Sequence, residues 1–183
     1  MPLRDLSLHI LDLVENSIRA GASVISVTVA ENREQNTLRI VVEDNGVGLS
    51  VPAEVAADPF FTTKKGKRTG LGLSLFRAAA ERAGGSMTIE KSALGGVSVE
   101  AVMKLDHTDR SPLGDLAATL SSVVCTNPGI ELRCRLEGGT QQCEVRVADV
   151  AKEFPVGERY GLAVARRVAE KIKQGLTAIG VRE

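Results

Sequence analysis

The stretch EDNGVGL, Glu43–Leu49, decides the fold that this sequence predicts. It follows an alternating run, ending at Val42, that is typical of a strand, and its Asn and two glycines allow a sharp turn where that strand ends. Asp44 is therefore expected at the mouth of a pocket. An ionised carboxylate only accepts hydrogen bonds, so Asp44 suits a donor such as the exocyclic amine of adenine, with Gly46 and Gly48 leaving room for the ring. Taken alone, Asp-Asn-Gly is equally compatible with a simple hairpin turn.

Composition and charge narrow the class of protein. The chain has 183 residues, 43% of them hydrophobic, enough for a substantial core in one large domain or two small ones. Its 23 basic and 23 acidic residues balance, so we expect neither nucleic acid nor a membrane as a partner. No apolar run approaches the roughly 20 residues of a membrane span, and the N-terminus lacks a signal-peptide pattern. The three cysteines form no CxxC pair, which fits a reducing compartment, and we expect a cytoplasmic protein.

A helix is predicted over about residues 3–20, because apolar residues recur there at helical spacing and Gly21 follows. Polar residues form a second stripe on this helix, three or four positions apart: Asp5, His9, Asp12, Asn16 and Arg19. Asp12 and Asn16 lie one turn apart and point the same way. The stripe is either a solvated outer face or a surface that meets a ligand through Asp12 and Asn16.

Alternation predicts strands at residues 24–30, 38–43, 87–90 and 97–105. Between the second and third strands lies the cation-rich segment DPFFTTKKGKRTG, followed by GLGLS and a helix to about residue 83. Backbone N–H groups and the helix dipole attract anions at such a glycine-rich helix start, so the segment suits phosphate, although it could equally carry solvated charges. The pattern predicts an α/β (α+β) fold, a two-layer sandwich of a mixed sheet covered by helices on one face.

Four motifs, taken together and in this order, resemble the ATP-binding domain of the GHKL (Bergerat-fold) superfamily, which sensor histidine kinases, gyrase, certain heat-shock chaperones and MutL-type mismatch-repair proteins share. They are LVENSIRAGAS at 13–23, EDNGVGL at 43–49, PFFTTKK at 59–65 and TGLGLS at 69–74. The resemblance covers about residues 3–105, and four ordered motifs are far more specific than a lone glycine box. The segment PFFTTKK to TGLGLS is most similar to histidine kinases, whereas LVENSIRAGAS is more similar to mismatch repair.

The resemblance implies that the chain binds ATP or ADP together with Mg²⁺. It makes Asn16 the oxygen ligand of Mg²⁺, an ion that is content with few protein oxygens beside phosphate and water. It makes Asp44 the acceptor for the adenine amine, with Gly46 and Gly48 beside the base and ribose. The residues implied near the phosphates are Thr63, Lys64, Lys65, Thr69, Gly70, Leu71 and Gly72.

Two positions depart from the family pattern. The hydrolytic branch has a Glu four residues before the Asn, where it polarises the attacking water, and this chain has Asp12 there. Asp12 is one methylene shorter, so slow hydrolysis is compatible with it and efficient hydrolysis is in doubt. The family often has a Thr near phosphate in its last strand, where this chain has Val97, with Ser98 as the nearest hydroxyl.

A histidine kinase also needs a phosphoacceptor helix, usually with a His followed by an acidic residue. Only residues 1–5 precede the first predicted helix, His9 is followed by Ile10, and His107 lies in a polar linker. We therefore expect His9 to be a structural or ligand-side residue and any phosphoacceptor to lie in another protein.

Residues 108–183 are expected to form a separate α-β-β-α interaction module, after an ATP-binding domain at residues 1–107. Gly138-Gly139 predicts a two-residue hairpin turn that places Cys134 opposite Cys143 and Arg133 opposite Glu144. The two cysteines are then either inert buried thiols or a redox-sensitive pair. A last helix is predicted over residues 157–175, with Tyr160 on its apolar face.

The leading interpretation is a Mg·ATP-binding regulatory protein with histidine-kinase-like phosphotransfer to a separate protein, or with slow ATP hydrolysis. The alternative is a non-catalytic nucleotide-sensing subunit that controls a partner protein. A MutL-like repair ATPase is disfavoured by the neutral charge and the missing transducer domain. The segment SPLGDLAATL also resembles the tail of small ATP-binding proteins that accompany iron-only hydrogenase subunits. A homodimer is also compatible with the sequence.

Overall fold

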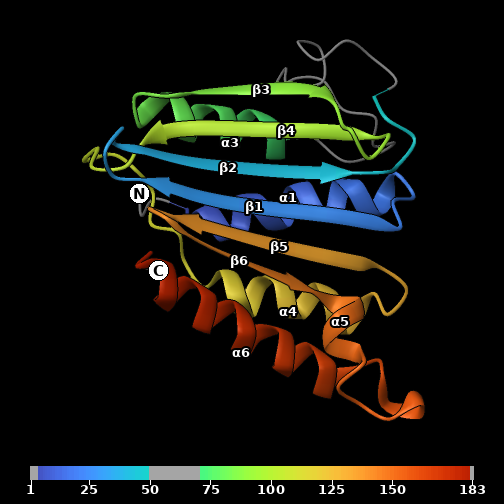
Figure 1. Cartoon of the computed structure of the whole chain (residues 1–183). Helices are drawn as coiled ribbons and strands as arrows, with labels where there is room; N and C mark the ends of the chain where they lie inside the picture. Colours follow the sequence, from blue (N-terminus) through green and yellow to red (C-terminus); the bar gives the residue numbers. More distant parts are fainter. Residues whose placement is uncertain (1–3, 50–70, 182–183) are drawn as a thin grey trace.

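The computed structural model describes residues 4–49 and 71–181 (Figure 1). The elements in chain order are α1 (Leu6–Arg19), β1 (Val24–Asn32), β2 (Thr37–Asp44), α3 (Leu71–Arg82), β3 (Ser86–Lys91), β4 (Val97–Lys104), α4 (Leu116–Thr126), β5 (Glu131–Gly138), β6 (Gln141–Arg146), α5 (Val147–Ala151), the 3-10 turn η1 (Val156–Glu158) and α6 (Leu162–Ile179). The strands form one sheet in the order β3-β4-β2-β1-β5-β6. Only β1 and β5 run parallel, so the sheet is mixed, as the sequence predicts.

The helices α1, α3, α4 and α6 lie on one face of this sheet (Figure 1). Successive side chains of a strand point to opposite faces, and in β1 the buried residues Ile25, Val27 and Val29 share the face that the helices cover. The opposite face carries polar and charged side chains such as Arg39 and Arg135. This is the predicted two-layer sandwich. In the described ranges, no helix combines the length and the apolar character that crossing a membrane requires.

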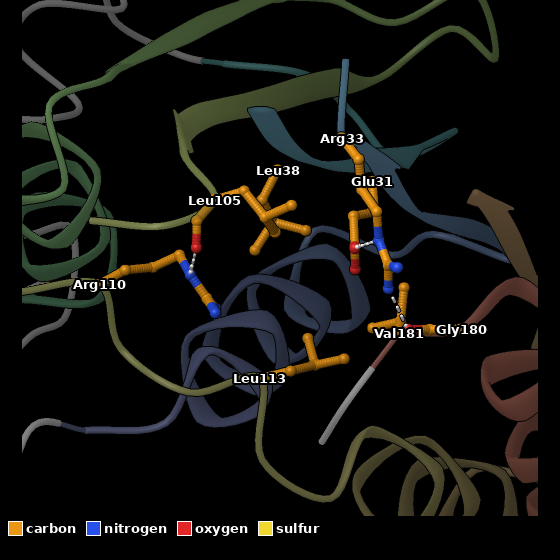
Figure 2. Close-up of a pocket in the computed structure, with 8 residues that line it drawn as sticks. All are labelled: Glu31, Arg33, Leu38, Leu105, Arg110, Leu113, Gly180 and Val181. Atoms are coloured by element: carbon orange, nitrogen blue, oxygen red, sulfur yellow. Dashed lines mark hydrogen bonds and ion pairs between the residues drawn. The ribbon is translucent and has the colours of Figure 1, made fainter. Parts of the chain in front are cut away.

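The C-terminal part of the chain continues the sheet of the N-terminal part. β5 pairs with β1 along the whole length of β5, and both contribute to one hydrophobic core. The segment before α4 is tied to the start of α1, where the backbone N–H of Leu6 donates a 2.9 Å hydrogen bond to the carbonyl of Pro112. Arg33, in the β1–β2 turn, donates a 2.8 Å hydrogen bond from Nη2 to the carbonyl of Gly180, at the end of α6 (Figure 2). The strands before and after the expected domain boundary near residue 107 therefore belong to one continuous sheet.

The β5–β6 hairpin turns at Gly139-Thr140, and the predicted turn at Gly138-Gly139 is wrong by one position. Gly138 stays in β5 because it packs under the end of α6, where a Cβ on Gly138 would lie 2.6 Å from the carbonyl oxygen of Ile179. Gly139 adopts the left-handed conformation that the turn needs, with φ +58°. The pairing register is consequently shifted by two residues, which leaves every side chain on its predicted face but changes its partner.

The shift separates the two cysteines that the sequence places opposite each other. Cys134 opposes Val145 and Cys143 opposes Leu136, and all three cysteines are free thiols. Diagonal neighbours across an antiparallel pair lie roughly 7–8 Å apart, beyond the reach of a disulfide without backbone movement. Burial raises the pKa of the Cys134 thiol to about 12. The structure therefore favours the inert-thiol alternative over a redox-sensitive pair.

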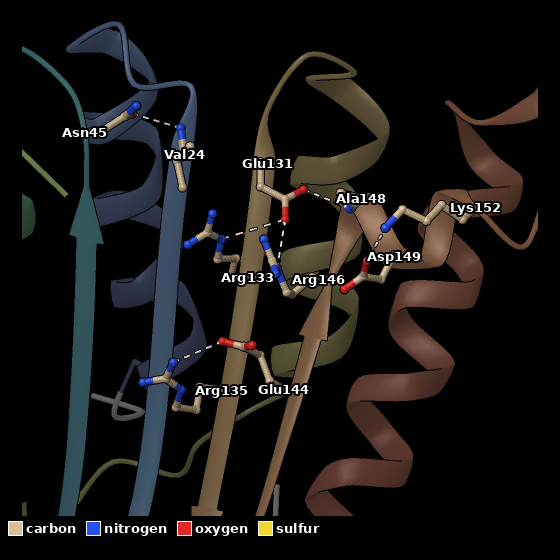
Figure 3. A network of polar contacts seen from close by, with 10 residues as sticks. All are labelled: Val24, Asn45, Glu131, Arg133, Arg135, Glu144, Arg146, Ala148, Asp149 and Lys152. Atoms are coloured by element: carbon tan, nitrogen blue, oxygen red, sulfur yellow. Dashed lines mark hydrogen bonds and ion pairs between the residues drawn. The ribbon is translucent and has the colours of Figure 1, made fainter. Parts of the chain in front are cut away.

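The charged pairs on the uncovered face change in the same way. Arg133 opposes Arg146, whereas the predicted partner was Glu144. Glu131 lies beside both arginines, with Oε1 3.8 Å from Nε of Arg133 and 3.5 Å from Nε of Arg146 (Figure 3). Its Oε2 accepts a 2.8 Å hydrogen bond from the backbone N–H of Ala148 at the start of α5. One carboxylate thus offsets the repulsion between two opposed guanidinium groups.

The last helix begins later and ends later than predicted. α6 starts at Leu162, so Tyr160 precedes it and is 70% exposed instead of lying on an apolar helix face. The helix does not end at Gly175 but continues to Ile179. Glycine is required at position 175 because α6 packs too closely against the sheet there for a side chain to fit. A Cβ on Gly175 would lie 2.8 Å from Cδ1 of Leu136 and 3.2 Å from Sγ of Cys143. This glycine lets α6 approach β5 and β6 closely and does not end the helix.

Candidate functional site

A cavity of about 120 Å³ opens between the second half of α1, the end of β2, the start of β4 and α3. Most of its wall is apolar, from Leu13, Val42, Leu73, Val97 and Val99. Its polar side chains are those of Asn16, Ser17 and Asp44. Apolar walls with a few fixed polar groups are typical of sites that hold a flat ring by its faces and read its edge by hydrogen bonds.

Asp44 ends β2 and lies at this cavity, as the sequence predicts, with only 5% of its surface exposed. Its Oδ2 accepts a 2.6 Å hydrogen bond from the hydroxyl of Ser17. Its Oδ1 accepts hydrogen bonds from the backbone N–H groups of Gly46, at 2.9 Å, and Val97, at 3.3 Å. An ionised carboxylate offers about four acceptor positions, so these three bonds fix its orientation and leave capacity for one ligand donor.

The glycines around Asp44 allow the backbone to approach its carboxylate. Gly48, with φ +81°, lines the cavity. Gly46 does not line it, and its backbone N–H donates the 2.9 Å hydrogen bond to Oδ1 of Asp44. Gly96, which the sequence analysis did not single out, is the most constrained of them. Its N–H donates a 3.0 Å hydrogen bond to the carbonyl of Asp44, and a Cβ there would lie 2.1 Å from Oδ1 of Asp44. Any larger residue at this position would displace the carboxylate.

Asn45 and Ser17 are two further residues that sequence reasoning did not assign to the site. Oδ1 of Asn45 accepts 2.9 Å hydrogen bonds from the backbone N–H groups of Ser23 and Val24, which fastens the EDNG turn to the start of β1 (Figure 3). Ser17 is one of the buried residues of α1, near the apolar side chains of Leu13 and Val14. A hydroxyl at a buried position needs a hydrogen-bond partner, so Ser17 could have indicated that a buried polar group lies against this helix.

Asn16 lines the cavity, but Asp12 does not. The Oδ1 atom of Asn16, the predicted magnesium ligand, accepts a hydrogen bond from Nη2 of Arg19. Asp12 forms an ion pair with Arg4, its Oδ2 lying 2.9 Å from Nη1. Asp12 also lies against the start of α3, since a Cβ on Gly72 would be 3.2 Å from its Cβ. The structure thus brings Asp12 together with Gly72, and Asn16 together with Asp44.

The polar side chains at this cavity suit Mg²⁺ better than a metal ion whose ligands are all protein side chains. Within residues 4–49 and 71–181, no three His, Cys, Asp or Glu side chains gather as they would around a metal ion. Mg²⁺ commonly uses one or two protein oxygens and completes its shell with phosphate and water, and the amide oxygen of Asn16 is chemically able to be one of them.

His9 is only 3% exposed and stacks on Phe76, with 5.5 Å between the ring centroids. Its Nδ1 has no hydrogen-bond partner among the residues that the structure describes. Burial, assisted by the positive charge of Arg4, lowers the pKa of His9 to about 4. A neutral imidazole buried between α1 and α3 is suited to packing and not to accepting a phosphoryl group.

Most of the predicted phosphate contacts lie beyond the residues that the structure describes. They are Thr63, Lys64, Lys65, Thr69 and Gly70. Leu71 is the first residue of α3, and its side chain is not described. Val97 lines the cavity, whereas Ser98, the next residue of β4, belongs to the opposite face of the sheet. Ser98 therefore does not replace the family threonine.

Residues 3–107 match a family model described as histidine kinase-, DNA gyrase B-, and HSP90-like ATPase. The histidine protein kinase DivJ of Caulobacter vibrioides is 36% identical over an alignment of 104 residues that covers 52% of this chain and 17% of DivJ. The sensor protein kinase CarS of Pseudomonas aeruginosa is 30% identical over an alignment of 103 residues that covers 55% of this chain and 22% of CarS. The chain therefore spans about a fifth of the length of these curated relatives.

Solved structures with similar folds include the ATP-binding domain of PrrB from Mycobacterium tuberculosis, which is 25% identical with a TM-score of 0.40 over 54% of this chain and 66% of that chain. A nucleotide-free catalytic domain of the histidine kinase ThkA is 28% identical with a TM-score of 0.45, over 56% of this chain and 68% of that chain. The match to the family covers more than half of the residues and includes Asn16, Asp44 and Gly48. This chain belongs to the family of histidine kinase-, DNA gyrase B- and HSP90-like ATPases, and its residues 3–107 are a GHKL ATP-binding domain.

Proposed function

We propose that this chain binds Mg·ATP or Mg·ADP beside Asp44 and passes the γ-phosphate to a separate protein, as a histidine kinase does. The observation that carries the proposal is the buried Asp44 carboxylate, held by three hydrogen bonds with acceptor capacity left beside an apolar cavity. The kinase part is supported by the names of the relatives, DivJ and CarS, which are both protein kinases.

Adenine recognition follows from the geometry of the cavity. The exocyclic amine would donate to Asp44, and the faces of the ring would lie against side chains such as Leu13 and Leu73. Because a buried carboxylate left without its donor is costly, this arrangement selects adenine over a base that presents a carbonyl at the same place. Gly48 would lie beside the base or ribose.

The phosphates would extend towards the start of α3, whose N-terminal end attracts anions. Asn16 would supply an oxygen to Mg²⁺, after its amide oxygen exchanges the hydrogen bond from Arg19 for the ion. The ion, when bound, would neutralise charge on the phosphates. The proposed phosphate contacts are Thr63, Lys64, Lys65, Thr69 and Gly70 in the preceding segment and Leu71 and Gly72 at the start of α3.

Hydrolysis is the weaker form of the proposal, because Asp12 is not free to act as a base. Its carboxylate is paired with Arg4 at 2.9 Å, so this ion pair must open before Asp12 can act on a water molecule. If Asp12 nevertheless supports slow hydrolysis, Asp12→Asn will abolish phosphate release and Asp12→Glu will raise it.

The second candidate function is a nucleotide-sensing subunit that controls a partner protein without transferring phosphate. It is favoured by the same contacts: Asp12 is held by Arg4, and Asn16 by Arg19. The resemblance of SPLGDLAATL to hydrogenase-associated proteins, the cytoplasmic location and a homodimer remain predictions.

One experiment separates these functions. The protein is incubated with Mg²⁺ and γ-labelled ATP, alone and with a cell lysate, beside the variant Asn16→Ala. Label on a lysate protein that depends on Asn16 supports phosphotransfer, whereas phosphate release without labelled protein supports hydrolysis. Binding of ATP with neither outcome supports nucleotide sensing and contradicts the kinase proposal.

A further inference from the structure

Figure 2 shows a second, larger cavity of about 330 Å³. The strand register places it at the opposite end of the sheet from Asp44. It is enclosed by the end of β1 and the start of β2, the segment between β4 and α4, and the end of α6. Asp44 pairs with Ile25 near the start of β1, and Glu31 of this cavity is six residues further along the strand. At roughly 3.3 Å per residue the two sites are therefore about 20 Å apart.

Half of the residues that line this cavity come from the part of the chain that the family match leaves out. Its apolar side chains are Leu38, Leu105, Leu113 and Val181, and the last two lie beyond residue 107. The volume falls within the roughly 300–1,000 Å³ of small-molecule sites, which combine apolar walls with a few convergent polar groups. The cavity is therefore a feature of this chain and not the nucleotide site of its family.

Arg33 provides the first charged wall. Its Nε donates to Oε1 of Glu31 at 2.7 Å, and its Nη2 donates to the carbonyl of Gly180 at 2.8 Å. The Glu31 side chain is only 8% exposed and the Arg33 side chain 68%, so the salt bridge ties a solvent-facing guanidinium to a buried carboxylate. Nη1 of Arg33 has no acceptor in the part of the chain that the structure describes.

Arg110 provides the second charged wall, on the side of the cavity opposite Arg33 (Figure 2). Its Nε donates a 2.6 Å hydrogen bond to the carbonyl of Leu105, and its Nη1 donates to the carbonyl of Ser111 at 3.1 Å. These backbone contacts fix the plane of the guanidinium. Its Nη2, like Nη1 of Arg33, lacks an acceptor within residues 4–49 and 71–181.

The balance of charge and apolar surface selects one class of ligand. Two guanidinium groups and the Glu31 carboxylate give the cavity a net charge of about +1, which repels a cation and neutralises a single negative charge. A neutral hydrocarbon would cover the leucines but displace water from the guanidinium N–H groups without offering them an acceptor in its place. A carboxylate accepts from guanidinium nitrogens with good geometry, and a short hydrocarbon chain matches the remaining wall.

We propose that this cavity is a binding site for a small amphipathic monoanion, a carboxylate that carries a short hydrocarbon chain. The carboxylate accepts hydrogen bonds from Arg110 and Arg33, and the chain lies against Leu38, Leu105 and Leu113. The site requires no nucleotide, so its test is independent of the function proposed above.

The test uses the full chain without nucleotide and hexanoate as the probe, with 1-hexanol and hexylamine as ligands of the same length but different charge. Binding is followed by amide chemical shifts in NMR titrations. Hexanoate is expected to bind with a dissociation constant on the order of 1 mM, at least about tenfold tighter than either control ligand, and to shift the amides of Leu105, Leu113 and Val181.

Two variants make the assignment specific. Arg110→Gln is expected to weaken hexanoate binding at least about tenfold, whereas the matched control Arg135→Gln, on the uncovered face of the sheet, leaves it unchanged. Val181→Phe fills the cavity without changing its charge and should also block binding, and it decides the question if Arg110→Gln does not fold. Equal binding of hexanoate to both the wild type and Val181→Phe, equal binding of hexylamine and hexanoate, or no saturable hexanoate binding at millimolar concentrations would overturn the proposal.

Discussion

The hydroxyl of Ser17 donates a 2.6 Å hydrogen bond to Oδ2 of Asp44, and both residues are buried. This bond connects α1, which also carries Asn16, to the end of β2, which carries the proposed adenine acceptor. The helix and the strand therefore hold the two sides of the cavity in a fixed relation, and the orientation of Asp44 depends on a residue far away in the sequence.

Ser17→Ala is expected to weaken Mg·ADP binding by about three- to tenfold, because Asp44 keeps its charge but loses one of the bonds that orient it. The free energy of unfolding should fall by about 1 kcal/mol. Calorimetric titration and thermal denaturation measure both effects, and Ser122→Ala, an exposed serine of α4, is the control. Wild-type affinity in a folded Ser17→Ala protein would show that this bond does not orient the acceptor.

Gly96→Ala is expected to damage the site although no side chain is removed. The new Cβ would lie 2.1 Å from Oδ1 of Asp44, so the carboxylate must move. We expect a loss of about 1–3 kcal/mol of stability and at least about tenfold weaker ADP binding. Gly129→Ala is the control, since a Cβ there meets no atom within 4 Å. If both variants bind ADP alike, the close approach at Gly96 is not required.

Removing residues 110–183 is expected to leave an insoluble or unfolded fragment. The deletion takes away β5, the neighbour of β1, and exposes the unpaired edge of β1 together with part of the common core. Size-exclusion chromatography and circular dichroism test this directly. A soluble fragment that unfolds cooperatively and binds ADP like the full chain would instead support two separate domains.

Acidification is expected to destabilise the protein through His9. Burial lowers its pKa from 6.5 to about 4, so between these values the unfolded chain takes up a proton that the folded chain does not. Stability from this group is therefore fully present above about pH 6.5 and is lost as the pH falls towards 4, by up to about 3 kcal/mol. His9→Phe keeps a ring against Phe76 and should remove this part of the pH dependence in urea denaturation, whereas His107→Gln should retain it. An unchanged pH dependence in His9→Phe would contradict this role.

Three of the residues that the sequence singles out, Asn16, Asp44 and Gly48, line the cavity in the structure. Asp44 and Gly48 sit in one contiguous turn, and Asn16 lies on a helix whose period is clear, so short-range rules place all three. Ser17 and Gly96 reach Asp44 from other parts of the chain, and no local pattern shows that they converge on one carboxylate. Convergence of this kind depends on tertiary packing.

The C-terminal half shows the same limit at the level of the fold. Both glycines at positions 138 and 139 satisfy the rule for a hairpin turn, and only the approach of Ile179 decides that the first belongs to β5. Gly175 reads as a helix end until the close contact with Leu136 is known. The alternation of β5 predicts a strand but not its neighbour, because parallel pairing with β1 joins residues about a hundred positions apart.

Calorimetric titration of Mg·ADP into the wild type and Asp44→Asn tests the central claim most directly. Asp149→Asn, on the exposed helix α5, is the matched control. The account predicts that Asp149→Asn binds like the wild type and that Asp44→Asn loses about 1.5–3 kcal/mol, about tenfold or more in affinity, because the adenine amine loses its charged acceptor. An Asp44→Asn protein that folds and binds Mg·ADP with wild-type affinity would contradict it.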